Sequence, residues 1–132
     1  MDIEDWKSQL KRGSLELCIL TLLKNRPYYG YELIATLSRW EIVSAKENTM
    51  YPLLRRLTKE QFLESYWEEP EKGPKRKYYR VTPLGINYLV EMTTQWANLK
   101  LAITDIQKLE EKVLITESQS KRHWIISVHP NY

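Results

Sequence analysis

Apolar residues recur at helical spacing in the first third of the chain. The series between Ser14 and Lys24 predicts an amphipathic helix, which Asn25-Arg26-Pro27 ends. A second helix is predicted after Tyr28-Tyr29-Gly30, with a buried side made of Leu33, Ile34, Leu37 and Trp40. The preceding segment, residues 1–12, is polar and is interpreted as a short helix or arm.

A third amphipathic segment follows. Its apolar residues fall at i, i+3, i+4 and i+7, so we expect them to face the core: Met50, Leu53, Leu54 and Leu57. Ser44 and Glu47 have the spacing of a capping box, while Pro52 leaves two helix starts open, at Ala45 or near Asn48. The outward positions are polar or basic: Lys46, Asn48, Thr49, Tyr51, Arg55 and Lys59.

Two short strands, about 63–67 and 77–82, are predicted to pair across a turn rich in glycine and proline. Tyr79 and Val81 would face one side of the hairpin, and Tyr78 and Arg80 the other. Thr82 is a favourable N-cap, and Pro83 suits the first position of a following helix. Basic residues crowd the turn and the start of the second strand: Lys72, Lys75, Arg76 and Lys77.

The last long segment, about 83–115, is predicted to be one helix with an apolar seam. The seam residues alternate steps of three and four: Leu89, Met92, Trp96, Leu99, Ile103 and Ile106. A helix of this length cannot bury such a stripe against a domain this small, so we expect dimerisation through a second copy of it. Residues 116–132 lack a clear period and are interpreted as a flexible tail.

Composition adds limits to this picture. The chain has 132 residues and 42% hydrophobic content, which predicts one domain (1–82) with an appended helix (83–115) and tail (116–132). Cys18 is the single cysteine, which excludes an internal disulfide and a CxxC metal pair, and it is expected in the core. No signal peptide or membrane-spanning run is apparent, so a cytoplasmic location without membrane association is expected.

Catalytic chemistry is not indicated. No GxSxG, P-loop, GxGxxG or HExxH pattern occurs, and both histidines, His123 and His129, lie in the predicted tail. We therefore predict no enzyme activity, no catalytic residue, no metal ligand and no cofactor.

Three short helices, a basic hairpin and a long helix predict a mainly α fold with a small β-hairpin, a winged helix-turn-helix. Net charge is only +3, so the clustering of basic residues, rather than their total, favours double-stranded DNA as the partner. The third helix would read bases in a major groove, and the wing would hold phosphates. Any one outward residue alone is more typical of a solvated helix face. The alternative function is a winged-helix module that binds proteins instead of DNA.

Three acidic residues, Glu68, Glu69 and Glu71, dilute the charge on the first side of the hairpin. They either pair with the lysines when DNA is absent or decide which side of the wing faces the phosphates.

Four blocks carry a family resemblance: Gly13–Leu20, Tyr29–Leu33, Thr49–Leu57 and Arg76–Gly85. In this order they resemble the PadR-like transcriptional regulators. The resemblance implies a dimeric winged-helix protein, generally a repressor, whose DNA affinity falls when a small molecule binds. A single C-terminal helix resembles the shorter branch of the family, in which some members bind planar aromatic compounds between subunits against a tryptophan of that helix.

Trp96 is the residue that this resemblance places in the effector site. It lies on the seam, where two copies would sandwich a planar aromatic ligand. The other interpretation is that Trp96 anchors the dimer as a core aromatic residue. The segment after Leu114 departs from the shorter branch, and it would cover or fill such a cavity.

Overall fold

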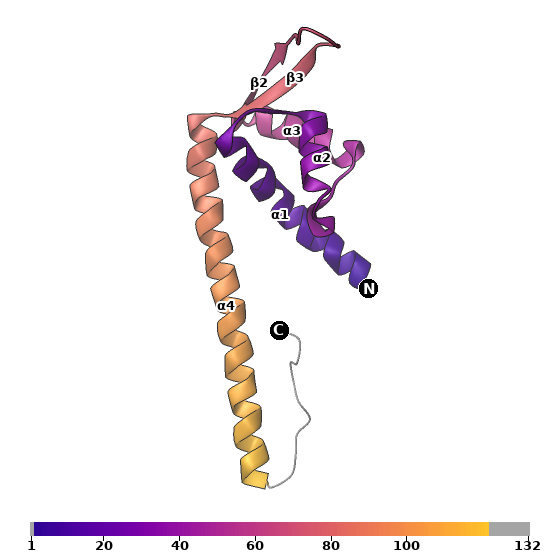
Figure 1. Cartoon of the computed structure of the whole chain (residues 1–132). Coiled ribbons are helices and arrows are strands. Elements are labelled where there is room, and N and C mark those ends of the chain that lie inside the picture. The colour runs from indigo at the N-terminus through magenta and orange to yellow at the C-terminus, as the bar shows by residue number, and fades with distance from the viewer. Residues whose placement is uncertain (1, 122–132) are drawn as a thin grey trace. The chain divides into compact units, whose positions relative to one another are not determined.

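The computed structural model describes the backbone of residues 2–121 and the side chains of residues 2–109. In this part of the chain the elements in order are α1 (Ile3–Asn25), β1 (Tyr28–Tyr29), α2 (Gly30–Leu37), the short 3-10 helix η1 (Glu41–Val43), α3 (Glu47–Lys59), β2 (Leu63–Glu68), β3 (Arg76–Val81) and α4 (Pro83–Lys121) (Figure 1). The predicted fold class, mainly helical with a small antiparallel sheet, is confirmed. The first compact unit ends at Met92, so α4 from Thr93 onward is described by itself.

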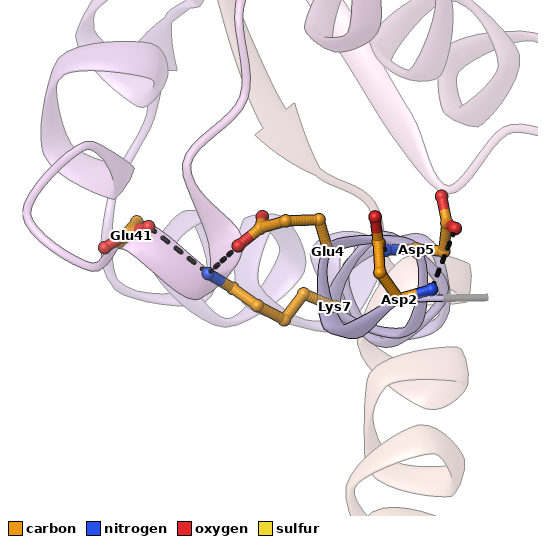
Figure 2. Close-up of polar contacts among 5 residues, drawn as sticks. All are labelled: Asp2, Glu4, Asp5, Lys7 and Glu41. Carbon is orange, nitrogen blue, oxygen red and sulfur yellow. Dashed lines mark hydrogen bonds and ion pairs between the residues drawn. The ribbon is translucent and has the colours of Figure 1, made fainter.

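The N-terminal segment and the first predicted helix form one continuous helix, α1, of 23 residues. Asp2 caps its start, because its carboxylate accepts the backbone N–H of Asp5 at 3.0 Å. The Asp5 carboxylate in turn accepts the N–H of Asp2 at 3.3 Å, which completes a capping box (Figure 2). This cap explains why the helix begins well before the apolar series.

The hydrophobic core joins α1, α2 and α3, largely as the apolar spacing predicts. Its most buried side chains are Ile19, Leu20, Leu33, Met50, Leu54, Leu57 and Leu63. Trp40 does not belong to it: α2 ends at Leu37, and the Trp40 side chain is 51% exposed. The 3-10 helix that follows turns Val43 into the core instead. The prediction that Trp40 lies on the buried side of the second helix was therefore wrong.

Helix α3 begins at Glu47, and its N-cap, Lys46, makes no side-chain capping hydrogen bond. Ser44 instead ends η1, where its backbone N–H donates to the Glu41 carbonyl at 3.2 Å. The predicted capping box of Ser44 and Glu47 was therefore wrong. Pro52 lies inside the helix, where it cannot donate to the Asn48 carbonyl one turn earlier.

The sheet is three-stranded and antiparallel in the order β1-β3-β2. The wing hairpin pairs Leu63 with Val81 at one end and Glu68 with Arg76 at the other. Strand β1 was not predicted, and it pairs Tyr28 with Tyr79 and Tyr29 with Tyr78. The wing is therefore fixed at its base to the segment that leads into α2.

Thr82 connects the wing to α4 as the predicted N-cap. Its hydroxyl oxygen accepts the backbone N–H of Gly85 at 3.0 Å and donates to the Gln61 carbonyl at 2.6 Å. Leu89, in the second turn of α4, is 4% exposed and belongs to the core of its own chain, and Met92 packs against that core.

The helix continues to Lys121, past the predicted end at residue 115. Residues 122–132 of the predicted tail lie outside the described residues.

Candidate nucleic-acid interface

A groove of about 480 Å³ separates α3 from the wing. Tyr51 and Arg55 line it from α3, and Arg76 and Lys77 line it from β3. The remaining lining residues come from β1, the start of α2, and the two long strands: Tyr29, Gly30, Tyr31, Trp67 and Tyr79. The structure therefore brings four of the predicted DNA-contact residues, from segments far apart in sequence, around one concave surface.

The remaining predicted residues of α3 are exposed at its two ends. Lys46, Asn48 and Thr49 line a second hollow, next to α1, and Lys59 lies in the last turn and lines neither hollow. On the wing, Lys72 and Lys75 are exposed in the turn between β2 and β3, outside the groove lining.

The ring of Tyr51 packs against Gly30, in space that a side chain at that position would fill. A Cβ at Gly30 would lie 2.5 Å from Cε1 of Tyr51 and 2.9 Å from its hydroxyl oxygen. Burial raises the pKa of the Tyr51 phenol, and nearby Glu47 raises it further. The hydroxyl is therefore protonated at neutral pH, so it can donate a hydrogen bond to a phosphate or a base and can accept one from a base.

The outer face of the sheet carries a row of tyrosines that supports two arginines. Tyr78 stacks on Tyr66 with ring centroids 5.7 Å apart and meets Tyr29 edge-on at 5.5 Å. The Arg76 guanidinium lies 4.6 Å from the ring centroid of Tyr29. Arg80 lies 4.9 Å from that of Tyr66 and also bonds to Glu64 at 2.6 Å. The ring of Tyr29 restricts the orientation of Arg76, and the ring of Tyr66 together with the Glu64 carboxylate restricts that of Arg80.

In the part of the chain that the structure describes, the cations of the wing tip have no carboxylate partner. Among the described residues, no ion pair joins Lys72, Lys75, Arg76 or Lys77 to a carboxylate. This leaves Glu68, Glu69 and Glu71 as neighbours in sequence rather than partners in ion pairs.

Two adjacent arginines of α3 have different surroundings. Arg56 bonds to Glu60 at 3.1 Å and to Glu16 of α1 at 3.1 Å, so it holds α1 and α3 together. Hydrogen bonds to these two carboxylates raise the pKa of Arg56. Arg55 forms no ion pair with any described residue, and it is the arginine that lines the groove.

Sequence reasoning missed Trp67, Tyr29 and Tyr31 in the groove. Trp67 is 63% exposed and lies directly opposite Lys77 in the hairpin register. The register of the hairpin was the signal that would have found it, because cross-strand partners share one face of a sheet.

Comparison with known proteins agrees with this arrangement. Residues 19–91 match the transcriptional regulator PadR-like family. An uncharacterised protein of Lysinibacillus sphaericus is 40% identical over 96 residues, which cover 71% of this chain and 88% of that protein.

Solved structures are similar over most of the chain. A PadR family transcriptional regulator from Eggerthella lenta is 33% identical with a TM-score of 0.71, covering 80% of this chain and 91% of that one. A PadR-like transcriptional regulator from Bacillus cereus is 34% identical with a TM-score of 0.69, covering 75% of this chain and 96% of that one.

Within residues 2–121, no helix is both long and apolar enough to cross a membrane. The match over residues 19–91 and the similarity to solved regulators identify the family, and the groove between α3 and the basic wing is consistent with it. This chain belongs to the PadR-like family of transcriptional regulators, which bind DNA.

Proposed function

We propose that this protein is a ligand-responsive repressor that binds a pseudo-palindromic operator as a homodimer. The observation that carries the proposal is the groove shared by α3 and the wing, with Tyr51 and Arg55 on one side and Arg76 and Lys77 on the other. A helix in the major groove and a cation-rich hairpin beside it would engage base edges and phosphates at the same time.

The two sides of the groove have different proposed tasks. Asn48, Thr49, Tyr51 and Arg55 would read bases, because amide, hydroxyl and guanidinium groups match base edges in the major groove. Phosphates would be held by two sets of cations. The first is Lys46 and Lys59 at the ends of α3, and the second is the wing cations Lys72, Lys75, Arg76 and Lys77.

Replacing Lys75, Arg76 and Lys77 together with alanine tests the wing. We expect weaker binding to every DNA sequence alike and a shallower dependence of log K on log[salt], by about 0.9 for each phosphate that the variant no longer neutralises. A titration of the upstream region of the protein's own gene, with competitor DNA present, measures both. An unchanged salt slope would contradict a role of the wing in phosphate binding.

The dimer is supported by an apolar stripe on α4. Trp96, Leu99, Ile103 and Ile106 recur at steps of three and four, and all four are exposed in the single chain. Leu89 and Met92 serve the chain's own core, so the proposed dimer seam begins at Trp96. A second exposed apolar series, Ile3, Trp6 and Leu10, runs along the first half of α1.

Repression needs no surface beyond the DNA-binding surface and the dimer seam. A dimer bound over a promoter would exclude RNA polymerase by overlap, so DNA binding and self-association suffice for the proposed role. The family consists of transcriptional regulators rather than enzymes.

Trp96 is the proposed effector-binding residue. Trp96 is 50% exposed, so a flat aromatic compound could stack on its ring, although it would have to share that ring with the Lys100 ammonium, which lies over it at 5.4 Å from the centroid. We expect planar aromatic compounds to quench tryptophan fluorescence in the wild type and not in Trp96→Ala. If the quenching survives this substitution, it belongs to another tryptophan.

The interpretation of Trp96 as a dimer anchor predicts a different result. Trp96→Ala would then weaken self-association, measured by light scattering, whether or not an aromatic compound is present.

A further inference from the structure

A second hollow, of about 380 Å³, lies between the N-terminal half of α1 and the start of α3. Asn48 and Thr49, at the exposed start of α3, form part of its lining, as does Lys46. Lys7 and Lys11 line it from α1. The sequence pattern assigned no role to Lys7 or Lys11.

The lysines of the hollow differ in their partners. Lys7 Nζ lies 3.3 Å from Glu4 Oε1 and 3.3 Å from Glu41 Oε1, so two carboxylates bracket it (Figure 2). Glu41 is highly exposed, and exposed ion pairs contribute little, so this one exchanges readily for another anion. Among the described residues, no ion pair involves Lys11 or Lys46.

We propose that this hollow receives a backbone phosphate of the duplex, with Lys11 and Lys46 as its ligands. The inference rests on the proposed function, because it takes Asn48 and Thr49 to face DNA. In helix-turn-helix proteins the recognition helix enters the groove while an earlier helix crosses the backbone. Here α1 supplies lysines at the same hollow as the start of α3, so α3 is flanked by phosphate-binding cations from the wing and from α1.

In this proposal the Glu41 carboxylate weakens phosphate binding in the hollow. The lining holds three lysines and two glutamates. Glu41 binds Lys7 and adds negative charge to the same hollow in which a phosphate on Lys11 and Lys46 would lie. The carboxylate therefore competes with DNA, and its removal increases affinity.

The first test compares Lys11→Gln with Lys24→Gln, which makes the same charge change on the same helix. Lys24 is exposed in the last turn of α1, about 20 Å along the axis from Lys11 at 1.5 Å per residue. Binding to a labelled duplex from the upstream region is measured between about 50 and 200 mM NaCl, and circular dichroism confirms that both variants are folded.

We expect Lys11→Gln to make the salt slope shallower by about 0.9, which is a change of about 3.5-fold in the affinity ratio across this fourfold salt range. Lys24→Gln should keep the wild-type slope. Equal slopes in the two variants overturn the proposal.

The second test removes the negative charge of Glu41. Glu41→Gln should bind the same duplex severalfold more tightly than the wild type, whereas Glu91→Gln, an equal charge change at an exposed residue of α4, should do so much less. Equal gains in the two variants would mean that only net charge matters, and the role of Glu41 would be rejected.

Three further outcomes separate the causes of failure. If Lys11→Gln abolishes stabilisation of the free protein by inorganic phosphate but keeps the wild-type DNA slope, the hollow binds a free anion and the DNA phosphate is the wrong ligand. If the wild type binds duplex and the wing variant loses affinity while Lys11→Gln does not, this inference fails and the proposed function stands. If the wild type ignores duplex even at low salt, both fail.

Discussion

At the scale of single residues, the glycine at the start of α2 determines where a candidate base-reading side chain lies. Tyr51 occupies the space that a Cβ at Gly30 would need, with only 2.5 Å between that position and Cε1. The clash involves the far end of a side chain that can rotate, not the backbone. An added methyl group would therefore move Tyr51 and leave the fold in place.

We predict that Gly30→Ala alters sequence preference more than stability. The free energy of unfolding should change by less than about 1 kcal/mol, because alanine also favours the helix that begins there. Tyr51 should shift within the groove, so the ranking of operators that differ by single base pairs should change. Competition binding with such a set measures this, and a ranking identical to that of the wild type would contradict the role of Tyr51.

At the scale of elements, the junction between the wing and α4 is packed against backbone. Thr82 caps α4, and its backbone N–H donates to the Phe62 carbonyl at 3.0 Å. A Cβ at Gly85 would collide with that same carbonyl oxygen and lie 2.7 Å from Cγ2 of Val81. Neither the strand nor the helix can yield without breaking the cap.

Gly85→Ala is accordingly predicted to destabilise the protein by about 2–3 kcal/mol, since overpacking against backbone leaves no flexible group to move. Urea unfolding followed by circular dichroism gives the value. Gly13→Ala is the matched control: nothing lies within 4 Å of its added Cβ, so it should stabilise the middle of α1 by about 0.5–1 kcal/mol. Similar effects of the two substitutions would refute the packing argument.

Helical periodicity predicted which faces of the elements are buried. The predicted end of the first helix, at Asn25-Arg26-Pro27, is also confirmed, but periodicity did not predict where α2 ends. Leu54 and Leu57 are in the core as expected. The spacing extends equally well to Trp40, yet no glycine or proline marks the end of α2 before it. Strand β1 has two residues and exists because Tyr28 and Tyr29 pair with β3, which is a tertiary interaction that no local pattern contains.

The residues of the candidate site also fall into two groups: those that local sequence features predict and those that depend on tertiary packing. Exposed polar residues of α3 and a cation-rich turn are local features, so Arg55 and Lys77 could be nominated from the sequence. The hollow with Lys7 depends on how α1 packs on η1, and an ordinary solvated helix has the same pattern of lysines. The residues that line this hollow with Lys7 could therefore not be predicted from the sequence.

At the scale of the whole molecule, the proposed function requires two copies. One recognition helix reads only a few base pairs, whereas a dimer reads two half-sites about 34–36 Å apart and multiplies the discrimination. The stripe from Trp96 to Ile106 is the described surface on α4 that fits this purpose, because it is apolar, continuous on one face and exposed in the single chain.

We predict that Leu99→Glu makes the protein monomeric, because a charge on the seam would be buried without a partner in the dimer. Light scattering should show half the wild-type mass, and affinity for the operator should fall at low protein concentration while the fold is retained. Asn98→Glu is the control, since a step of one residue turns Asn98 about 100° around α4 from Leu99, away from the seam, where the same charge stays in water. A dimeric Leu99→Glu protein would move the interface away from this stripe, and the exposed series on α1 would then be the next surface to test.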